Sequence, residues 1–235
     1  MLSTGAETGL AFAGDGSRVW IARQEAGGSA ILTATRAGDR WTAANPLPFP
    51  APHRDEAPAV GPTGTFLVFA SHRGATPDRQ RLWMSYHIAR QWTPPHALQL
   101  GAPRDADDRD PCVAADGALY FASTRQGAGG SDLYRSPQSS RGYLEPTPIR
   151  ELNTEHDERQ PCVDPRGAFL IFRQITRDGA QDRLMVSFRK NATWAAPRPL
   201  RLTGASAPTL SPDGRMLWHI RGGRIFSVPL ADVLP

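Results

Sequence analysis

The chain has 235 residues and a formal net charge of only +4, and its 22 glycines and 22 prolines are spread along the whole length. This composition argues against disorder and favours a folded protein with many short elements joined by turns. Acidic and basic residues are interleaved without the basic stripe that nucleic-acid binding requires, so we predict no nucleic-acid partner.

The sequence predicts no membrane span, because no apolar run approaches the ~18 residues needed. The opening residues MLSTGAETGL lack the charged and apolar regions of a signal peptide. We therefore expect a cytoplasmic protein, or a periplasmic or secreted one if a leader has been removed. We expect a monomer. Two cysteines are too few for a disulfide framework and leave the compartment open.

Five segments in chain order share one plan, in which a short strand leads to a turn ending in Gly and a second strand follows. The second strand is rich in β-branched and aromatic residues. The segments are GLAFAGDGSRVWIAR from Gly9, APAVGPTGTFLVFASHRG from Ala57, DPCVAADGALYFASTRQG from Asp110, QPCVDPRGAFLIFRQITRDG from Gln160 and APTLSPDGRMLWHIRGG from Ala207. Their turn glycines recur about every fifty residues, which indicates an internal repeat.

A third strand follows the second, and a fourth follows in the first four copies. The third strands are expected over RLWMSY, SDLYRS, DRLMVSF and GRIFSV. The fourth strands are expected over RWTAANPLPF, QWTPPHALQL, GYLEPTPIRE and TWAAPRPLRL, whose prolines suit an exposed edge. Near the start of these strands one slot holds Trp41, Trp92, Tyr143 and Trp194, which we expect to pack between repeats.

Four antiparallel strands repeated at this period are the blade plan of a β-propeller. We predict an all-β fold, a five-bladed propeller with four-stranded antiparallel blades, as a single domain over residues 1–235. The blades are expected at about 7–54, 55–106, 107–156, 157–204 and 205–235. The last blade ends after its third strand, so it is either incomplete or closed by the N-terminus. A β-sandwich would not explain the repeat-for-repeat alignment of the turns.

The segment DPCVAADGALYFASTRQGAGGSDLYRS in the third copy and the SPDG turn at 211–214 carry a resemblance to a known family. The pattern resembles the TolB-type, WD40-like β-propeller repeat, and the resemblance covers essentially the whole chain. It implies the propeller fold. Proteins with this repeat include periplasmic translocation-system partners and peptidase propeller domains, so the resemblance specifies the fold more closely than the function.

Two charged positions recur at one end of the repeats. Three residues before the first strand, in the loop that leads into it from the previous blade, are the acids Glu7, Asp55, Asp108 and Glu158, with Ala205 in the fifth copy. The arginines after the second strand are Arg23, Arg73, Arg125, Arg177 and Arg221. We predict that the first four acids and arginines form a structural rim of pairs that join blades. Because Arg221 faces Ala205, it is predicted either to contact an anionic ligand or to pair with Asp213 or a terminal carboxylate.

Several further residues exceed what the repeat needs and are the candidate binding residues. They are Asp105, Asp107, Asp110, Glu155 and Asp157, together with His53, His156 and Arg221. Acidic loops suit Ca²⁺, but the ordered spacing of a calcium loop is missing. The two histidines suit a transition metal or proton transfer, or are solvated loop residues. We predict no cofactor, with a cation such as Ca²⁺ at the acidic loops as the alternative.

Cys112 and Cys162 are equivalent residues on the first strands of adjacent repeats, where the other copies have Ala11, Ala59 and Thr209. We expect them to fill small-residue positions in a tight inner ring. A disulfide would require Cα atoms within about 7 Å, which is short for strands of different blades.

Taken together, these features predict a non-catalytic binding or scaffold propeller that recognises a protein segment or a small polar ligand at the mouth of its central channel. The alternative is a five-bladed carbohydrate-active enzyme that uses Asp55, Asp108 and Glu158 as its three carboxylates. Arg partners argue against the enzyme, because they would lower a carboxylate pKa rather than raise one of the three.

Overall fold

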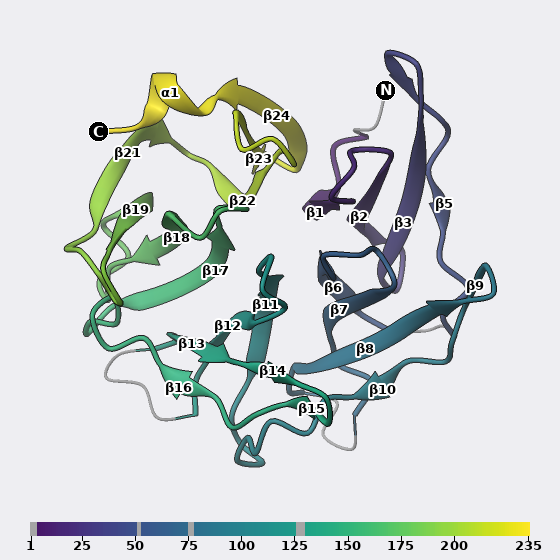
Figure 1. Cartoon of the computed structure of the whole chain (residues 1–235), viewed down its shortest axis with the longest axis horizontal. Helices are drawn as coiled ribbons and strands as arrows, with labels where there is room; N and C mark the ends of the chain where they lie inside the picture. The colour runs from purple at the N-terminus through teal and green to yellow at the C-terminus, as the bar shows by residue number, and fades with distance from the viewer. Residues whose placement is uncertain (1–3, 51–52, 75–77, 126–129) are drawn as a thin grey trace.

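The computed structural model describes residues 4–50, 53–74, 78–125 and 130–235. Five small antiparallel sheets are arranged around a central channel, with the first strand of each sheet innermost (Figure 1). The five-bladed all-β prediction is confirmed. Within the described residues the only helix is the four-residue α1 (Leu230–Val233), and no helix there is long and apolar enough to cross a bilayer.

The five sheets follow one another along the chain. The first contains β1 (Glu7–Phe12), β2 (Arg18–Glu25), β3 (Gly28–Ala37), β4 (Arg40–Trp41) and β5 (Asn45–Pro46). The second contains β6 (Asp55–Val60), β7 (Phe66–Ser71), β8 (Arg81–Ile88), β9 (Gln91–Trp92) and β10 (His96–Ala97). The third contains β11 (Asp108–Val113), β12 (Leu119–Ser123), β13 (Asp132–Ser136) and β16 (Thr147–Pro148), with the hairpin β14 (Gln138–Ser139) and β15 (Gly142–Tyr143) beside it. The fourth contains β17 (Asp157–Val163), β18 (Phe169–Ile175), β19 (Asp182–Lys190), β20 (Thr193–Trp194) and β21 (Arg198–Thr203). The fifth contains β22 (Ser206–Leu210), β23 (Met216–Arg221) and β24 (Arg224–Pro229).

The predicted fourth strand is divided into two pieces in each of the first four blades. In the first blade β4 extends the hairpin with β3, and β5 then pairs with the middle of β3. The Leu47 N–H donates to the Ile31 carbonyl at 2.8 Å just beyond β5. In the second, third and fourth blades a proline lies between the two pieces, where it lacks the N–H donor that continued pairing would use. The outer strand is therefore short, as an exposed edge tolerates.

The core lies between neighbouring blades rather than within any one of them. All six residues of β7 are buried, because a blade packs against each of its faces. The same burial explains why Phe69, Phe121 and Phe172, on the second strands, are fully buried. The aromatic residues predicted to pack between repeats lie against the apolar clusters that fill the spaces between blades. They are Trp41, Trp92, Tyr143 and Trp194.

Each inner strand carries a β-bulge near its start, where the register with the second strand shifts. In four blades a non-glycine residue directly before a proline has a positive φ: Ala57 (47°), Asp110 (52°), Gln160 (53°) and Ala207 (49°). Non-glycine residues rarely adopt this conformation, and a following proline disfavours a helical one. The bulge places these four residues on the wall of the channel.

The fifth blade differs from the others. Within the described residues its sheet has three strands, and the chain continues from β24 into α1. The buried side chains of Leu230 and Val233 join the apolar cluster between the fourth and fifth blades, where they pack with Leu200. The short helix thus covers apolar surface of the last blade.

The turn glycines supply a test of the repeat. Gly64 has φ +71°, and a methyl group at its Cα would contact nothing within 4 Å. Gly64→Ala should therefore lower the free energy of unfolding by about 1 kcal/mol through backbone strain alone. Gly74 is equally open but lacks a positive φ. Urea denaturation of Gly74→Ala should show almost no loss in the free energy of unfolding. Equal losses of stability in the two variants would contradict the conclusion that the turn at Gly64 requires a positive φ.

Candidate functional site at the central channel

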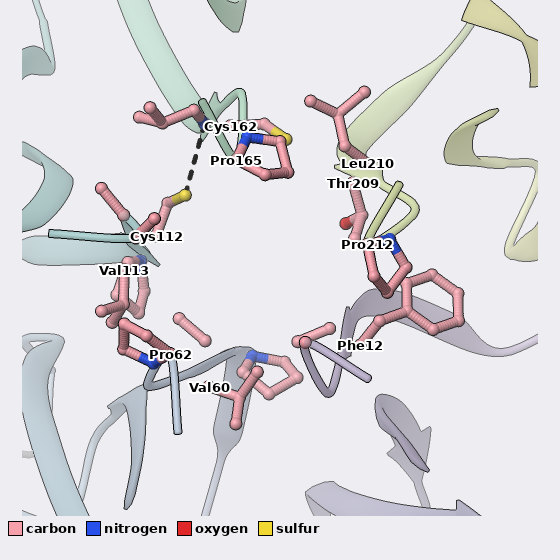
Figure 2. Close-up of a pocket in the computed structure, with 18 of the residues that line it drawn as sticks. Phe12, Val60, Pro62, Cys112, Val113, Cys162, Pro165, Thr209, Leu210 and Pro212 are labelled. Carbon is pink, nitrogen blue, oxygen red and sulfur yellow. Dashed lines mark hydrogen bonds between the residues drawn. The ribbon is translucent and has the colours of Figure 1, made fainter. Parts of the chain in front are cut away.

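The central channel contains two cavities. The turn-side cavity, about 280 Å³, lies where the inner strands end and turn back (Figure 2). The strand-start mouth, about 50 Å³, lies at the opposite end, where the inner strands begin. One ring of residues lines both cavities and therefore stands between them: Leu10, Pro58, Pro111, Pro161 and Pro208, together with the neighbouring Thr209. The channel is thus narrowed by four prolines and a leucine.

The turn-side cavity has an apolar wall. Phe12, Val60, Val113 and Leu210 surround its open centre in Figure 2. The Cys112 Sγ accepts a hydrogen bond from the Val163 N–H at 3.4 Å.

The two cysteines of this wall are both free. Burial raises the pKa of the Cys112 thiol to about 11 and also raises the pKa of Cys162. Both sulfurs are therefore neutral thiols near pH 7, in the small-residue positions that the sequence predicts for them. Neutral thiols are poor nucleophiles and poor metal ligands.

Three of the four predicted rim acids bind an arginine of their own blade. The Arg23 Nε lies 3.1 Å from Glu7, and Arg73 pairs with Asp55. In the third blade one Arg125 nitrogen lies 2.7 Å from both oxygens of Asp108.

The position of these acids differs from the prediction in one respect. Glu7, Asp55 and Asp108 are the first residues of β1, β6 and β11, rather than residues of the preceding loops. Arg125 also donates to the Leu100 carbonyl of the preceding blade at 2.7 Å, so this joint holds two blades together.

The predicted pairing of Glu158 with Arg177 is wrong. Register places Gln174 opposite Glu158, and the Gln174 side-chain amide donates to it at 3.0 Å. Thr154 supplies a second donor at 2.6 Å. In the second and third blades the arginine follows the second-strand partner by two residues, but that position here is Thr176. Arg177 is one residue further along and is exposed.

Arg221 lies away from the channel. It is exposed at the end of β23, opposite Arg224, and within the described ranges no ion pair involves it. Its Nε lies 3.6 Å from the position that a Cβ would take at Gly204. Asp213 does not bind Arg221, since its carboxylate caps its own turn through Ser211 and Arg215.

The alternative catalytic carboxylates do not form a cleft. Asp55, Asp108 and Glu158 are 5%, 2% and 0% exposed, and none lines either cavity. Each is bound to the donors described above. An acid–base pair that acts on a sugar must reach the substrate, and these three carboxylates are buried in the structure described here.

The surplus acids separate into three kinds. Asp105 and Glu155 are exposed. Asp107 accepts from the Gln80 N–H at 2.8 Å and pairs with Arg109 at 3.0 Å, while Asp157 binds the Ser131 N–H and Arg159. These two acids therefore tie loops together. Only Asp110 reaches the channel.

The histidines are separate from these acids. His53 and His156 are half-buried, and the Nδ1 of His156 has no hydrogen-bond partner. In the part of the chain that the structure describes, no three residues of the His, Cys, Asp or Glu types are close enough to share a metal ion.

Asp110 occupies the strand-start mouth together with Gln160. Desolvation raises the pKa of Asp110, although Arg109, Arg159 and the Gln160 backbone N–H oppose the shift. The Gln160 side-chain oxygen in turn accepts from the Ala207 N–H at 2.8 Å. Sequence reasoning missed Gln160, Arg109 and Arg159, although their position just before the inner-strand proline is visible in the aligned repeats.

No protein-family model matches the sequence, and the comparison with curated proteins gives no match. Solved structures are similar. A protein from Agrobacterium tumefaciens assigned as TolB is 17% identical, with a TM-score of 0.64 over 100% of this chain and 78% of that one. TolB from Acinetobacter baumannii is 15% identical, with a TM-score of 0.59 over 95% of this chain and 54% of that one. A gluconolactonase from Xanthomonas campestris is 16% identical, with a TM-score of 0.62 over 97% and 77%. The chain therefore has a TolB-like β-propeller fold, which enzymes also share.

The buried joint between Asp108 and Arg125 predicts a large loss of stability on substitution. Asp108→Asn leaves a buried guanidinium without its counter-charge and should lower the free energy of unfolding by about 3 kcal/mol. Asp116 is the matched control, because its side chain pairs with Arg135 but is 61% exposed. Asp116→Asn should cost less than about 1 kcal/mol. Unchanged thermal unfolding of Asp108→Asn would contradict a structural role.

Proposed function

We propose that the protein is a non-catalytic binding propeller that recognises a cationic group, on a protein segment or a small polar ligand, at the strand-start mouth. Asp110 would be the central contact. The observation that supports this assignment is a desolvated carboxylate on the channel wall at a position where the repeat does not require one.

The comparison between blades isolates Asp110. The equivalent residues are Gly9, Ala57, Gln160 and Ala207. Glycine and alanine satisfy the fold at this position, and Gln160 contributes a neutral hydrogen bond to the next blade. An ionised carboxylate there must give up solvation, which destabilises the folded state unless something compensates. Within the described residues no salt bridge compensates Asp110.

The charges around Asp110 favour a positive ligand. Arg109 pairs with Asp107, and Arg159 pairs with Asp157. These arginines are therefore largely neutralised by their own partners. Glu56, which receives hydrogen bonds from Gln80 and Ser29, adds further negative charge near Asp110. An ammonium or guanidinium group at the mouth would balance the excess negative charge around Asp110. It would also replace the solvation that the Asp110 carboxylate has lost.

The enzyme alternative lacks a comparable observation. Its three carboxylates are buried and bound, and fold similarity alone does not transfer an activity.

The desolvation of Asp110 predicts a pH-dependent gain of stability in Asp110→Asn. Asn tolerates the positive φ and keeps an acceptor for the Gln160 N–H. The folded-state pKa of Asp110 is raised above its unfolded value of ~3.9. The contribution of Asp110 to the free energy of unfolding therefore falls as pH rises through the interval between the two pKa values. The variant should therefore be more stable than the parent at pH 7 and equal to it near pH 4. Thermal unfolding measured from pH 4 to 8 tests this, and an Asn variant less stable at pH 7 would contradict it.

Ligand recognition is tested with simple probes that differ only in charge. NMR titration with n-butylammonium, ethylguanidinium and uncharged n-butanol should show binding of the two cations near Asp110. Asp110→Asn should weaken cation binding at least tenfold. Asp105→Asn, which removes an exposed acid of the same loop, serves as the charge-matched control. Equal loss in both variants, or cation binding that persists in Asp110→Asn, would overturn the proposal.

A further inference from the structure

We propose that the turn-side cavity is a second binding site and that it takes a small, uncharged, apolar molecule. This site lies beyond the ring of prolines from Asp110 and does not depend on the function proposed for the strand-start mouth.

The cavity wall is formed by equivalent apolar side chains from all five inner strands. Each stands two residues after the ring that narrows the channel: Phe12, Val60, Val113, Val163 and Leu210. Four of these five are only half-buried, so they present apolar surface to the cavity. A molecule that covers them removes this surface from water, and the gain increases with the area covered.

Three polar side chains of the wall already have hydrogen-bond partners. The Thr209 hydroxyl donates to the Leu10 carbonyl at 2.9 Å, and the Ser211 hydroxyl donates to Asp213 at 2.5 Å. The Cys112 sulfur is engaged by the Val163 N–H.

The backbone at the end of the cavity is satisfied in the same way. The last inner-strand N–H groups bond to the second strands, as Ala13 does to Arg18 and Gly61 does to Phe66, both at 2.9 Å. These two N–H groups are therefore not available to bind water in the cavity.

The uncharged lining of the turn-side cavity argues against an ionic ligand. Among the described residues, no Asp, Glu, Lys or Arg lines the turn-side cavity. Its two thiols are neutral, as shown above. A charged ligand would lose its solvation without gaining a counter-charge or an unpaired donor.

Size and shape favour a small molecule over a protein segment. The volume of about 280 Å³ is near the lower end of the range for small-molecule sites, ~300–1,000 Å³. Beyond the ring of prolines the strand-start mouth has a volume of only about 50 Å³, so it offers little room for a protein segment that would extend through the channel. The occupant therefore enters from the turn side and stops at the ring.

The test uses the uncharged fluorophore N-phenyl-1-naphthylamine, whose emission rises in apolar surroundings. We expect saturable binding of one dye per chain. Cys112→Trp, which fills the cavity from its wall, should weaken binding at least tenfold. Pro165→Glu, which places a charge at the exposed rim, should also weaken it, and it keeps the test valid if Cys112→Trp does not fold. Pro94→Glu, an exposed proline outside the cavity lining, is the matched control and should bind normally.

A second measurement uses the wild-type protein. Saturating dye should slow alkylation of Cys112 by iodoacetamide severalfold, as followed by mass spectrometry. Excess n-butylammonium should not displace the dye, which separates this site from the one at Asp110.

Three results would overturn the proposal. The first is binding that does not saturate or that persists in both Cys112→Trp and Pro165→Glu. The second is binding lost in Phe226→Ser, because Phe226 is 45% exposed on the outer strand and would place the dye on the exterior. The third is dimer formation that competes with the dye in light scattering, because the occupant would then be a second copy of the chain.

Discussion

Every blade depends on its neighbours to bury its second strand. The strand β7 is apolar along its length and buried at every residue, which a single sheet does not achieve. The apolar clusters accordingly combine residues of adjacent blades, as when Phe69 of the second blade packs with Trp20 of the first. Closing the ring is therefore a condition of stability rather than a consequence of it. The central channel exists because five inner strands must meet around one axis.

This dependence makes the repeat an internal standard for function. A residue that recurs at one position in several blades is explained by the ring, as Asp55 and Asp108 are by their arginines. A residue that departs from its equivalents requires another explanation. Gln160 has a structural one, since it binds the Ala207 N–H. Asp110 has none within its own blade, and this asymmetry separates it from the other surplus acids.

The sequence predicted the fold well because its period is long and its turns are strongly marked. The second strands begin at Phe66, Leu119, Phe169 and Met216, inside the aligned segments and two residues after their turn glycines. The division of the fourth strand was not predicted, because proline indicates an edge without showing where pairing stops. The error at Arg177 arose because this arginine lies in the turn after β18, one residue beyond the position that corresponds to Arg73 and Arg125.

The candidate site was less predictable than the fold. In the sequence, Asp105, Asp107 and Asp110 are three similar acids of one loop. In the structure Asp105 is exposed, Asp107 accepts a hydrogen bond from the Gln80 N–H, and Asp110 lines the channel. What distinguishes them is the bulge in β11, whose position depends on pairing with β12 rather than on local composition.

The two ends of the channel differ for a single physical reason. Side chains before the ring of prolines come from the bulge, where the backbone turns residues such as Asp110 and Gln160 toward the axis. Side chains beyond the ring come from regular strand, where apolar residues such as Val113 and Val163 face the axis. Burial at the bulge desolvates the Asp110 carboxylate, and desolvation is the main cause of its raised pKa. The bulge thus creates the electrostatic property that distinguishes the strand-start mouth from the apolar turn-side cavity.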